Sequence, residues 1–311
     1  MNMKKILLSV VCLVMVGIQS VQAQVAIAAL HHNDSVKIYS ASGLQNAIDD
    51  AVAGDTIYLS EGIFGGFTVT KPIAIIGAGQ TTNISSSVTI GKSGNTIEDG
   101  LLLSGLNFIQ NVSFSGTVSG VRISQCNIAG NCDMNNGSGS YSFDNIEILT
   151  SKINTLQLGN AVKGFTVVAS KITKISGYGA DEGSVTILNC NVKYSNTGST
   201  GNYNNLVNCI IGSAGGGVYQ NCLYGSTSAS PVLYDCYKNS DFTLDDDLNC
   251  SLTDDELKAA GYVGPDNTWV GINGGEVKFS LVMPVVQVTE HSVEVDQAER
   301  KLKVSLKLGN K

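Results

Sequence analysis

Apolar residues in the middle of the chain keep a fixed offset from a series of equivalent positions, which we call the ladder. The ladder residues are Leu106, Cys126, Ser151, Ser170, Cys190, Cys209, Cys222 and Cys236. Three residues before them stand Leu103, Ile123, Ile148, Val167, Ile187, Leu206, Tyr219 and Leu233. Two residues after them the side chain is again apolar or aromatic, until Lys238 breaks the pattern at the last repeat. The chain therefore contains repeats of 13 to 25 residues with a constant core and variable connections.

The pattern predicts short strands joined by a tight corner. Apolar residues at alternate positions indicate a strand with one buried face. The odd step of three residues up to the ladder means that the chain bends there and starts a second strand that again points inward. Asn189, Asn208, Asn221 and Asp235 stand just before ladder residues, and Asn and Asp tolerate the left-handed conformation that such a bend needs. Fixed strands with variable loops are typical of a β-solenoid, so we expect an all-β, right-handed parallel β-helix.

The two ends of the chain carry different patterns. Residues 41–240 are assigned to the β-helix, after an N-terminal linker over residues 24–40. Ser42 and Gln45 form a candidate capping box for a helix that would close one end of the solenoid. That helix would bury Leu44, Ala47, Ile48 and Ala51.

Residues 241–311 are expected to form an acidic and helical cap followed by a C-terminal β segment. Asp245, Asp246 and Asp247 form an acidic run, and Thr253 to Glu256 form a second capping box. Alternating apolar residues from Val293 and again from Leu302 predict a β-hairpin.

The first 23 residues resemble a secretory signal peptide. Lys4 and Lys5 precede an apolar run over 6–18, and Ala23 ends a small-residue cleavage site. The apolar run is too short to span a bilayer, and no later stretch is apolar enough. We therefore expect a secreted protein, extracellular or on the outer cell surface, without a transmembrane segment.

The acidic composition limits the partners. Loss of Lys4 and Lys5 would change the formal net charge from −7 to −9. Arg122 and Arg300 are the arginines of the whole sequence. Such a chain is poorly suited to phosphate groups, so nucleic acid is excluded as an expected partner. Polysaccharides or cell-surface glycans remain, and the oligomeric state is left open.

The opening of the β-helix region resembles a known superfamily. The segments 44–48, 53–59, 61–64 and 71–77, with sequences LQNAI, AGDTIYL, EGIF and KPIAIIG, are similar to the start of pectate-lyase-like right-handed β-helix proteins. The segment VGINGG over 270–275 resembles the C-terminal part of surface β-helix proteins of Gram-negative anaerobes. The resemblance implies the fold, whereas lyases, esterases, hydrolases and non-enzymes share it. The sequence lacks the arginine context of pectate lyases and the signatures of polygalacturonases and pectin methylesterases.

The cysteines are expected to form a reduced stack inside the solenoid. Parallel side chains on successive repeats point the same way rather than at one another, which disfavours disulfides. The one pair for which we consider a bridge is Cys126 with Cys132, across a loop. His31, His32 and His291 lie away from the cysteines, so no metal site and no cofactor are expected.

Five residues are candidate ligand contacts. Tyr178, Asp181 and Glu182 fall in a Gly-rich loop, where the carboxylates are the best local pair for acid–base chemistry. A solvated turn is the alternative interpretation. Tyr234 and Tyr237 occupy outward positions where rings stack on sugars, or else pack under the C-terminal hairpin. No catalytic residue is assigned.

Two further features allow more than one interpretation. The acidic residues 245–247, with those at 254–256, either bind calcium or form a charged run before a helix. Two residues before the ladder, Leu149, Val168, Leu188 and Val207 form an outward apolar stripe. We expect a long loop or the C-terminal hairpin to cover this stripe, with a partner protein as the alternative.

The function expected from the sequence is structural or binding, with glycans as the ligand class and no recognisable active site. The alternative is a polysaccharide lyase or glycoside hydrolase. A cleft lined by at least two carboxylates, or by a lysine with a carboxylate, would favour the enzyme, whereas uniformly Asn, Ser and Thr faces would favour binding.

Overall fold

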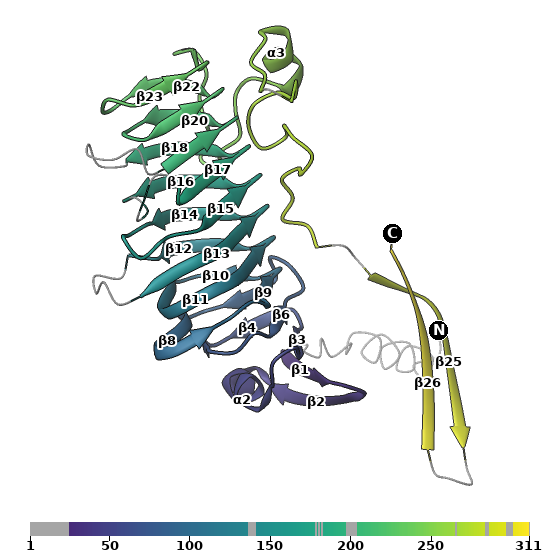
Figure 1. Cartoon of the computed structure of the whole chain (residues 1–311). Helices are drawn as coiled ribbons and strands as arrows, with labels where there is room; N and C mark the ends of the chain where they lie inside the picture. The colour runs from purple at the N-terminus through teal and green to yellow at the C-terminus, as the bar shows by residue number, and fades with distance from the viewer. Residues whose placement is uncertain are drawn as a thin grey trace, which may run out of the picture.

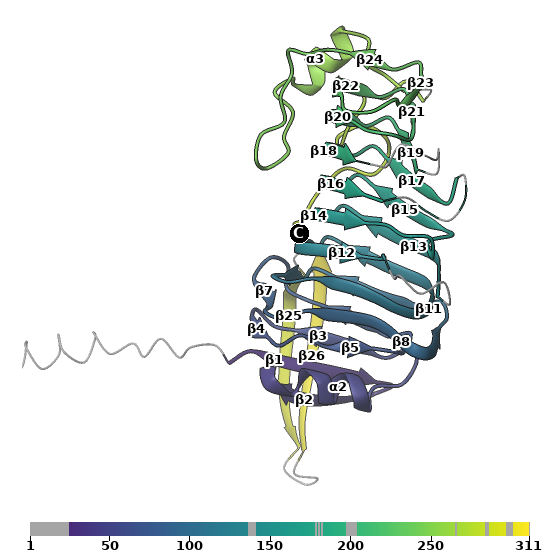
Figure 2. The same ribbon diagram turned by 90° about the vertical axis from the view of Figure 1, so that its left-hand side faces the viewer.

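A computed structural model describes residues 25–135, 141–177, 179, 181, 183–196, 204–264, 266–283, 286–296 and 301–310. Residues 1–23, for which a signal peptide is expected, lie outside these residues. Most described strands stack in parallel into one long sheet that winds around a common core, and the result is a rod (Figure 1, Figure 2). The predicted right-handed parallel β-helix is therefore confirmed.

Two series of strands run along the rod, one on each side of the ladder corner. The first series is β3 (Thr56–Leu59), β6 (Ala74–Ile76), β9 (Leu101–Ser104), β11 (Val112–Ser124), β13 (Ser142–Leu149), β15 (Phe165–Val168), β17 (Val185–Leu188), β19 (Asn204–Val207), β21 (Val218–Gln220) and β23 (Val232–Tyr234). The second is β4 (Gly62–Phe64), β7 (Thr82–Ile84), β10 (Asn107–Phe108), β12 (Asn127–Asp133), β14 (Lys152–Gln157), β16 (Lys171–Ser176), β18 (Asn191–Asn196), β20 (Ile210–Ala214), β22 (Leu223–Thr227) and β24 (Tyr237–Lys238). The short strand β5 (Thr68–Val69) pairs with β8 (Val88–Ile97), which pairs in turn with β11.

The strand register agrees with the predicted repeat at every rung. Ile123 pairs with Leu103 on one side and Ile148 on the other, and the same alignment continues from Val167 to Leu233. The residue before each ladder position has φ between +45° and +62°, including the predicted Asn189, Asn208, Asn221 and Asp235. The left-handed corner is therefore confirmed, and it also accepts Gln125, Thr150 and Ala169.

The ladder side chains close the hydrogen bonds of the corner. Ser170 Oγ accepts from the backbone N–H of Ser151 at 3.0 Å and donates to the carbonyl of Val168 at 2.8 Å. Cys209 Sγ does the same, accepting from the N–H of Cys190 at 3.4 Å and donating to the carbonyl of Val207 at 3.2 Å. Serine and cysteine are thus interchangeable here, because each supplies one short donor and acceptor.

The bridge considered between Cys126 and Cys132 does not form, and both residues are free and fully buried. The chain between them is strand β12 rather than a loop, and both side chains belong to the apolar core. Burial raises the pKa of both thiols to about 12, which leaves them protonated and unreactive at neutral pH.

The N-terminal end differs from the sequence prediction in two respects. The expected linker contains β1 (Ile27–His32) and β2 (Ser35–Ser40), an antiparallel hairpin whose first strand also pairs with β3. The helix α2 (Leu44–Asp50) buries the predicted apolar face, but the capping box is absent because the turn η1 (Ala41–Gly43) precedes it. Gln45 bonds instead to Asp49 and to the backbone of Thr68.

The C-terminal part begins with a small cap against the side of the rod. The second capping box is confirmed at α3 (Asp254–Ala259), where Thr253 and Glu256 bond reciprocally. Its Leu257 joins a separate apolar cluster with Ile210, Leu223, Phe242 and Val270. This cluster fixes the cap on the outward side of β20 and β22.

An extended segment, residues 266–283, then runs back along the ladder corner toward the N-terminal end, and we call it the strap (Figure 1). Near the cap, Gly271 N donates to Asn208 O at 2.7 Å. Far down the rod, Gln125 Nε2 donates to Val282 O at 2.7 Å, and Ser104 Oγ lies 3.8 Å from Met283 Sδ. The predicted hairpin follows as β25 (Val286–Asp296) and β26 (Lys301–Asn310), paired antiparallel.

The outward apolar stripe is partly shielded. Leu149, Val168, Leu188 and Val207 are half-buried. The strap lies along the corner residues that follow them, with Gly275 against Asn189 and Gly271 against Asn208. The segment that lies beside the apolar stripe is therefore the strap, and not the C-terminal hairpin.

Replacing Cys209 tests the ladder. Valine at this position removes the acceptor for the buried N–H of Cys190, which we expect to lower the free energy of unfolding by about 1–3 kcal/mol. Serine keeps the hydrogen bonds, as Ser151 and Ser170 do, so Cys209→Ser is expected to stay within about 1 kcal/mol of wild type. Urea unfolding of both variants measures the difference, and equal losses would show that the ladder bonds contribute nothing.

Candidate functional site

A row of polar side chains crosses the outer face of the first strand series. Arg122 of β11 pairs with Glu147 of β13, Glu147 with Thr166 of β15, and Thr166 with Thr186 of β17. All four stand four residues before the ladder, between two inward apolar positions, so the strand alternation turns them outward. They line an open groove of about 540 Å³. Backbone register alone thus places one polar group per rung along the rod.

One edge of this groove is made by the residues that lead into the strands. Asp144 Oδ1 accepts from the N–H of Asn145 at 2.9 Å, and Asn145 has φ of +48°. Gly164 lies so close that an added Cβ would stand 2.1 Å from Asp144 Oδ1. Ser184 completes the edge, with Oγ donating to the carbonyl of Asp181 at 2.6 Å. The edge therefore presents a carboxylate and an amide to the groove, whereas the Ser184 hydroxyl is bonded to the backbone of Asp181.

Arg122 and Glu147 form the main charged pair. Nε and Nη2 of the guanidinium both approach Glu147 Oε2, at 2.8 and 2.7 Å. The Arg122 side chain is 58% exposed, so its remaining N–H groups face solvent. Exposed pairs of this kind contribute about 0–1 kcal/mol to stability. The pair thus has little effect on the stability of the fold, and it leaves donors and an acceptor open to a ligand.

The structure separates the five predicted contacts. Asp181 is exposed in a turn whose backbone is held by Ser184, next to the polar groove. Tyr178 and Glu182 lie outside the described residues. Tyr234 is 56% exposed at the last rung.

Tyr237 is half-buried, with its ring 5.2 Å from that of Tyr262 and its hydroxyl donating to Val263 O. It packs under the C-terminal cap rather than under the hairpin, so the two tyrosines of the last rung do not form one sugar-stacking surface.

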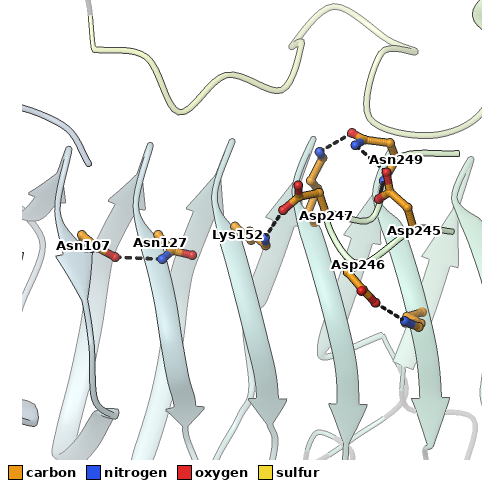
Figure 3. A network of polar contacts seen from close by, with 9 residues as sticks. Asn107, Asn127, Lys152, Asp245, Asp246, Asp247 and Asn249 are labelled. Carbon is orange, nitrogen blue, oxygen red and sulfur yellow. Dashed lines mark hydrogen bonds and ion pairs between the residues drawn. The ribbon is translucent and has the colours of Figure 1, made fainter. Parts of the chain in front are cut away.

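The acidic run over 245–247 is engaged with the side of the rod (Figure 3). Asp247 accepts from Lys152 at 2.8 Å, Asp246 lies 3.4 Å from Lys193, and Asp245 accepts from Asn249. The bond from Lys152 lowers the pKa of Asp247. These carboxylates dock the cap onto lysines of β14 and β18, which favours the charged run over the calcium interpretation.

A second cavity of about 310 Å³ lies between the rod and this cap. Its floor is apolar, with Ile210, Leu257 and Val270. Its amides are already bonded: Asn191 Nδ2 donates to Leu248 O, and Asn249 Oδ1 accepts from Lys171. Little polar capacity remains there for a ligand, so the polar groove is the stronger candidate.

The sequence analysis did not identify the groove residues, although the ladder contained the signal. The position four residues before the ladder is occupied in successive repeats by Arg122, Glu147, Thr166 and Thr186. A ladder that fixes inward positions also fixes the outward ones between them. Asp144 carried no such signal, because it lies where the loop enters the strand.

In comparisons with known proteins, no protein-family model, no curated protein and no solved structure matches the chain. Among the described helices, none combines the length and apolarity that crossing a membrane requires.

The two tyrosines of the last rung should respond differently to truncation. Tyr237→Ala removes the contact with Tyr262 and is expected to cost about 1–3 kcal/mol of unfolding free energy. Tyr234→Ala removes an exposed ring and should change stability by less than about 0.5 kcal/mol. Thermal unfolding of both variants measures this, and the reverse order would contradict the packing of Tyr237 under the cap.

Proposed function

We propose that this chain is a secreted or cell-surface β-helix protein of the pectate-lyase-like superfamily, of the kind found on Gram-negative anaerobes, and that it binds an extracellular glycan along the polar groove. The observation that carries the proposal is the row Arg122, Glu147, Thr166 and Thr186, one polar side chain on each of four successive rungs.

Sugar hydroxyls both donate and accept hydrogen bonds, and the groove offers both functions on neighbouring rungs. Thr166 and Thr186 supply hydroxyls, Arg122 supplies donors, and Asp144 supplies an acceptor. The rungs repeat every 4.7–4.9 Å or so, so a polymer lying along the rod meets a polar group at regular steps. Many weak equivalent contacts suit a repeating ligand.

The charge of the site narrows the glycan class. The sequence carries a formal net charge of −7, and the groove holds the carboxylates of Asp144 and Glu147 with one arginine. Polyanionic chains would be repelled by this field. The ligand is therefore a neutral or sparsely charged polysaccharide.

Removing one hydroxyl from the row tests the proposal. Thr186→Val keeps the shape and branching of the side chain but deletes a hydrogen bond of about 0.5–1.5 kcal/mol, so glycan affinity should fall between about twofold and tenfold. The measurement is affinity electrophoresis against a panel of neutral plant, host and bacterial polysaccharides.

Thr155→Val is the matched control, since Thr155 lies on β14 in the other strand series. Its affinity is expected to equal that of wild type. A wild-type protein that binds nothing in the panel, or equal losses in both variants, would refute the groove as a glycan site.

One observation favours a second candidate function, a polysaccharide lyase or glycoside hydrolase. Asp144 and Glu147 line the same groove as Arg122. Together they supply the two carboxylates that glycoside hydrolysis requires. Glu147 is paired with Arg122, and Asp144 accepts from a backbone N–H.

Mass spectrometry of polysaccharides incubated with the protein decides between binding and cleavage. For the binding protein we expect unshortened chains. Shortened products that disappear in Asp144→Asn and Glu147→Gln would establish an enzyme at this groove. Products that persist in both would direct attention to Asp181 and Glu182 instead.

A further inference from the structure

The last four ladder positions are cysteines with one common side-chain conformation. Cys190, Cys209, Cys222 and Cys236 each direct Sγ to the carbonyl two residues earlier, at 3.2–3.3 Å. Each also directs Sγ to a carbonyl of the preceding rung, at 3.3–3.7 Å. All four are free thiols.

This common conformation sets the distance between neighbouring sulfurs. The residues flanking Cys222 and Cys236 pair in register, with Gln220 opposite Tyr234 and Leu223 opposite Tyr237. Side chains with the same conformation on in-register strands are related by a simple translation. Their sulfurs are therefore separated by about one rung, or roughly 4.8 Å.

We propose that Cys222 and Cys236 form a two-coordinate site for a soft monovalent d10 cation, Cu(I), held linearly between their sulfurs. A Zn–thiolate bond is about 2.3 Å long, so two metal–thiolate bonds of similar length in line span about 4.6 Å, close to the rung spacing. Thiolates are the ligands that Cu(I) prefers. The sequence analysis expected no metal site because no histidine lies near the cysteines, but a linear site with two thiolate ligands needs no histidine.

The same geometry argues against a tetrahedral ion such as Zn²⁺. Among the described residues no three Cys, His, Asp or Glu side chains gather as a metal site. Stacked thiols on one line cannot surround an ion with four ligands. The cysteine ladder therefore favours a metal ion that is both soft and two-coordinate.

The pair lies at the open end of the stack. Cys190, Cys209 and Cys222 are fully buried, whereas Cys236 on the last rung is half-buried. The inward Leu233 of that rung is 37% exposed, so described residues leave the end of the core accessible. An ion can thus reach Cys236 first and Cys222 next.

Binding replaces two thiol protons by one metal ion. Cu⁺ adds to both sulfurs, two H⁺ leave to the buffer, and the bis-thiolate complex carries one negative charge. The backbone N–H of Cys209 donates to Cys222 Sγ at 3.4 Å, and that of Cys222 interacts with Cys236 Sγ, which stabilises this charge. Burial raises the pKa of the Cys222 thiol, and the bond to Cys222 raises that of Cys236. Affinity should therefore rise about 100-fold per pH unit, as release of two protons requires.

Serine substitution provides the test, because serine already occupies two ladder positions. The purified protein is titrated anaerobically with Cu(I) in competition with a chromophoric Cu(I) chelator, and X-ray absorption reports the ligands. Wild type is expected to bind one ion with two sulfur ligands. Cys222→Ser and Cys236→Ser should each weaken binding at least 100-fold while thermal stability is retained.

Two matched variants complete the design. Cys190→Ser changes a ladder thiol outside the pair, and Cys250→Ser removes a half-buried thiol outside the ladder. Both should bind Cu(I) as wild type does. Binding that survives Cys236→Ser, that is lost in Cys250→Ser, or that changes only tenfold per pH unit would overturn the two-thiol site.

Discussion

From Cys126 onward, each turn of this solenoid depends on a corner in which one residue adopts a left-handed backbone and the next supplies a short side chain that donates and accepts. The left-handed residue bends the chain, and the apolar side chains of the strands before and after the bend both point into the core. The ladder side chain then satisfies an N–H of the previous rung and a carbonyl of its own. Since a buried N–H without an acceptor costs about 1–3 kcal/mol, each corner is restricted to few residue types. Strand register, apolar packing and rung spacing all follow from it.

The sequence predicted what this corner controls. Inward positions from Leu103 to Tyr219 were correct at every rung, because burial selects apolar residues there, whereas Leu233 on the last rung is exposed. The capping box at Thr253 was also correct, whereas the one at Ser42 failed because a preceding 3₁₀ turn made Gly43 the first cap. Residues 24–40 lie before the repeats of the ladder, so the repeat pattern did not reveal the two strands there. Pairing with β3, a contact distant in sequence, stabilises them.

The candidate site was harder to predict because outward residues are not constrained by packing. Arg122, Glu147, Thr166 and Thr186 include a base, an acid and two hydroxyl residues, and their register is what joins them. The predicted tyrosines show the converse: Tyr234 and Tyr237 look alike in sequence, but the cap covers one and leaves the other exposed. Which outward residues stay open is decided by the segment after residue 240, whose position no local pattern encodes.

The strap has a consequence for how the chain reaches its native state. In an ideal repeat array each unit responds only to its neighbours, so segments can melt and reform independently. Here residues near 282 bond to the turn at Gln125, and residues near 271 bond to the turn at Asn208, so a segment synthesised after the rungs ties together rungs made much earlier. The rod can grow rung by rung from its N-terminal end, yet becomes one cooperative body only when the strap arrives. A chain that crosses a membrane unfolded would therefore stay susceptible to proteases until its final segment has emerged.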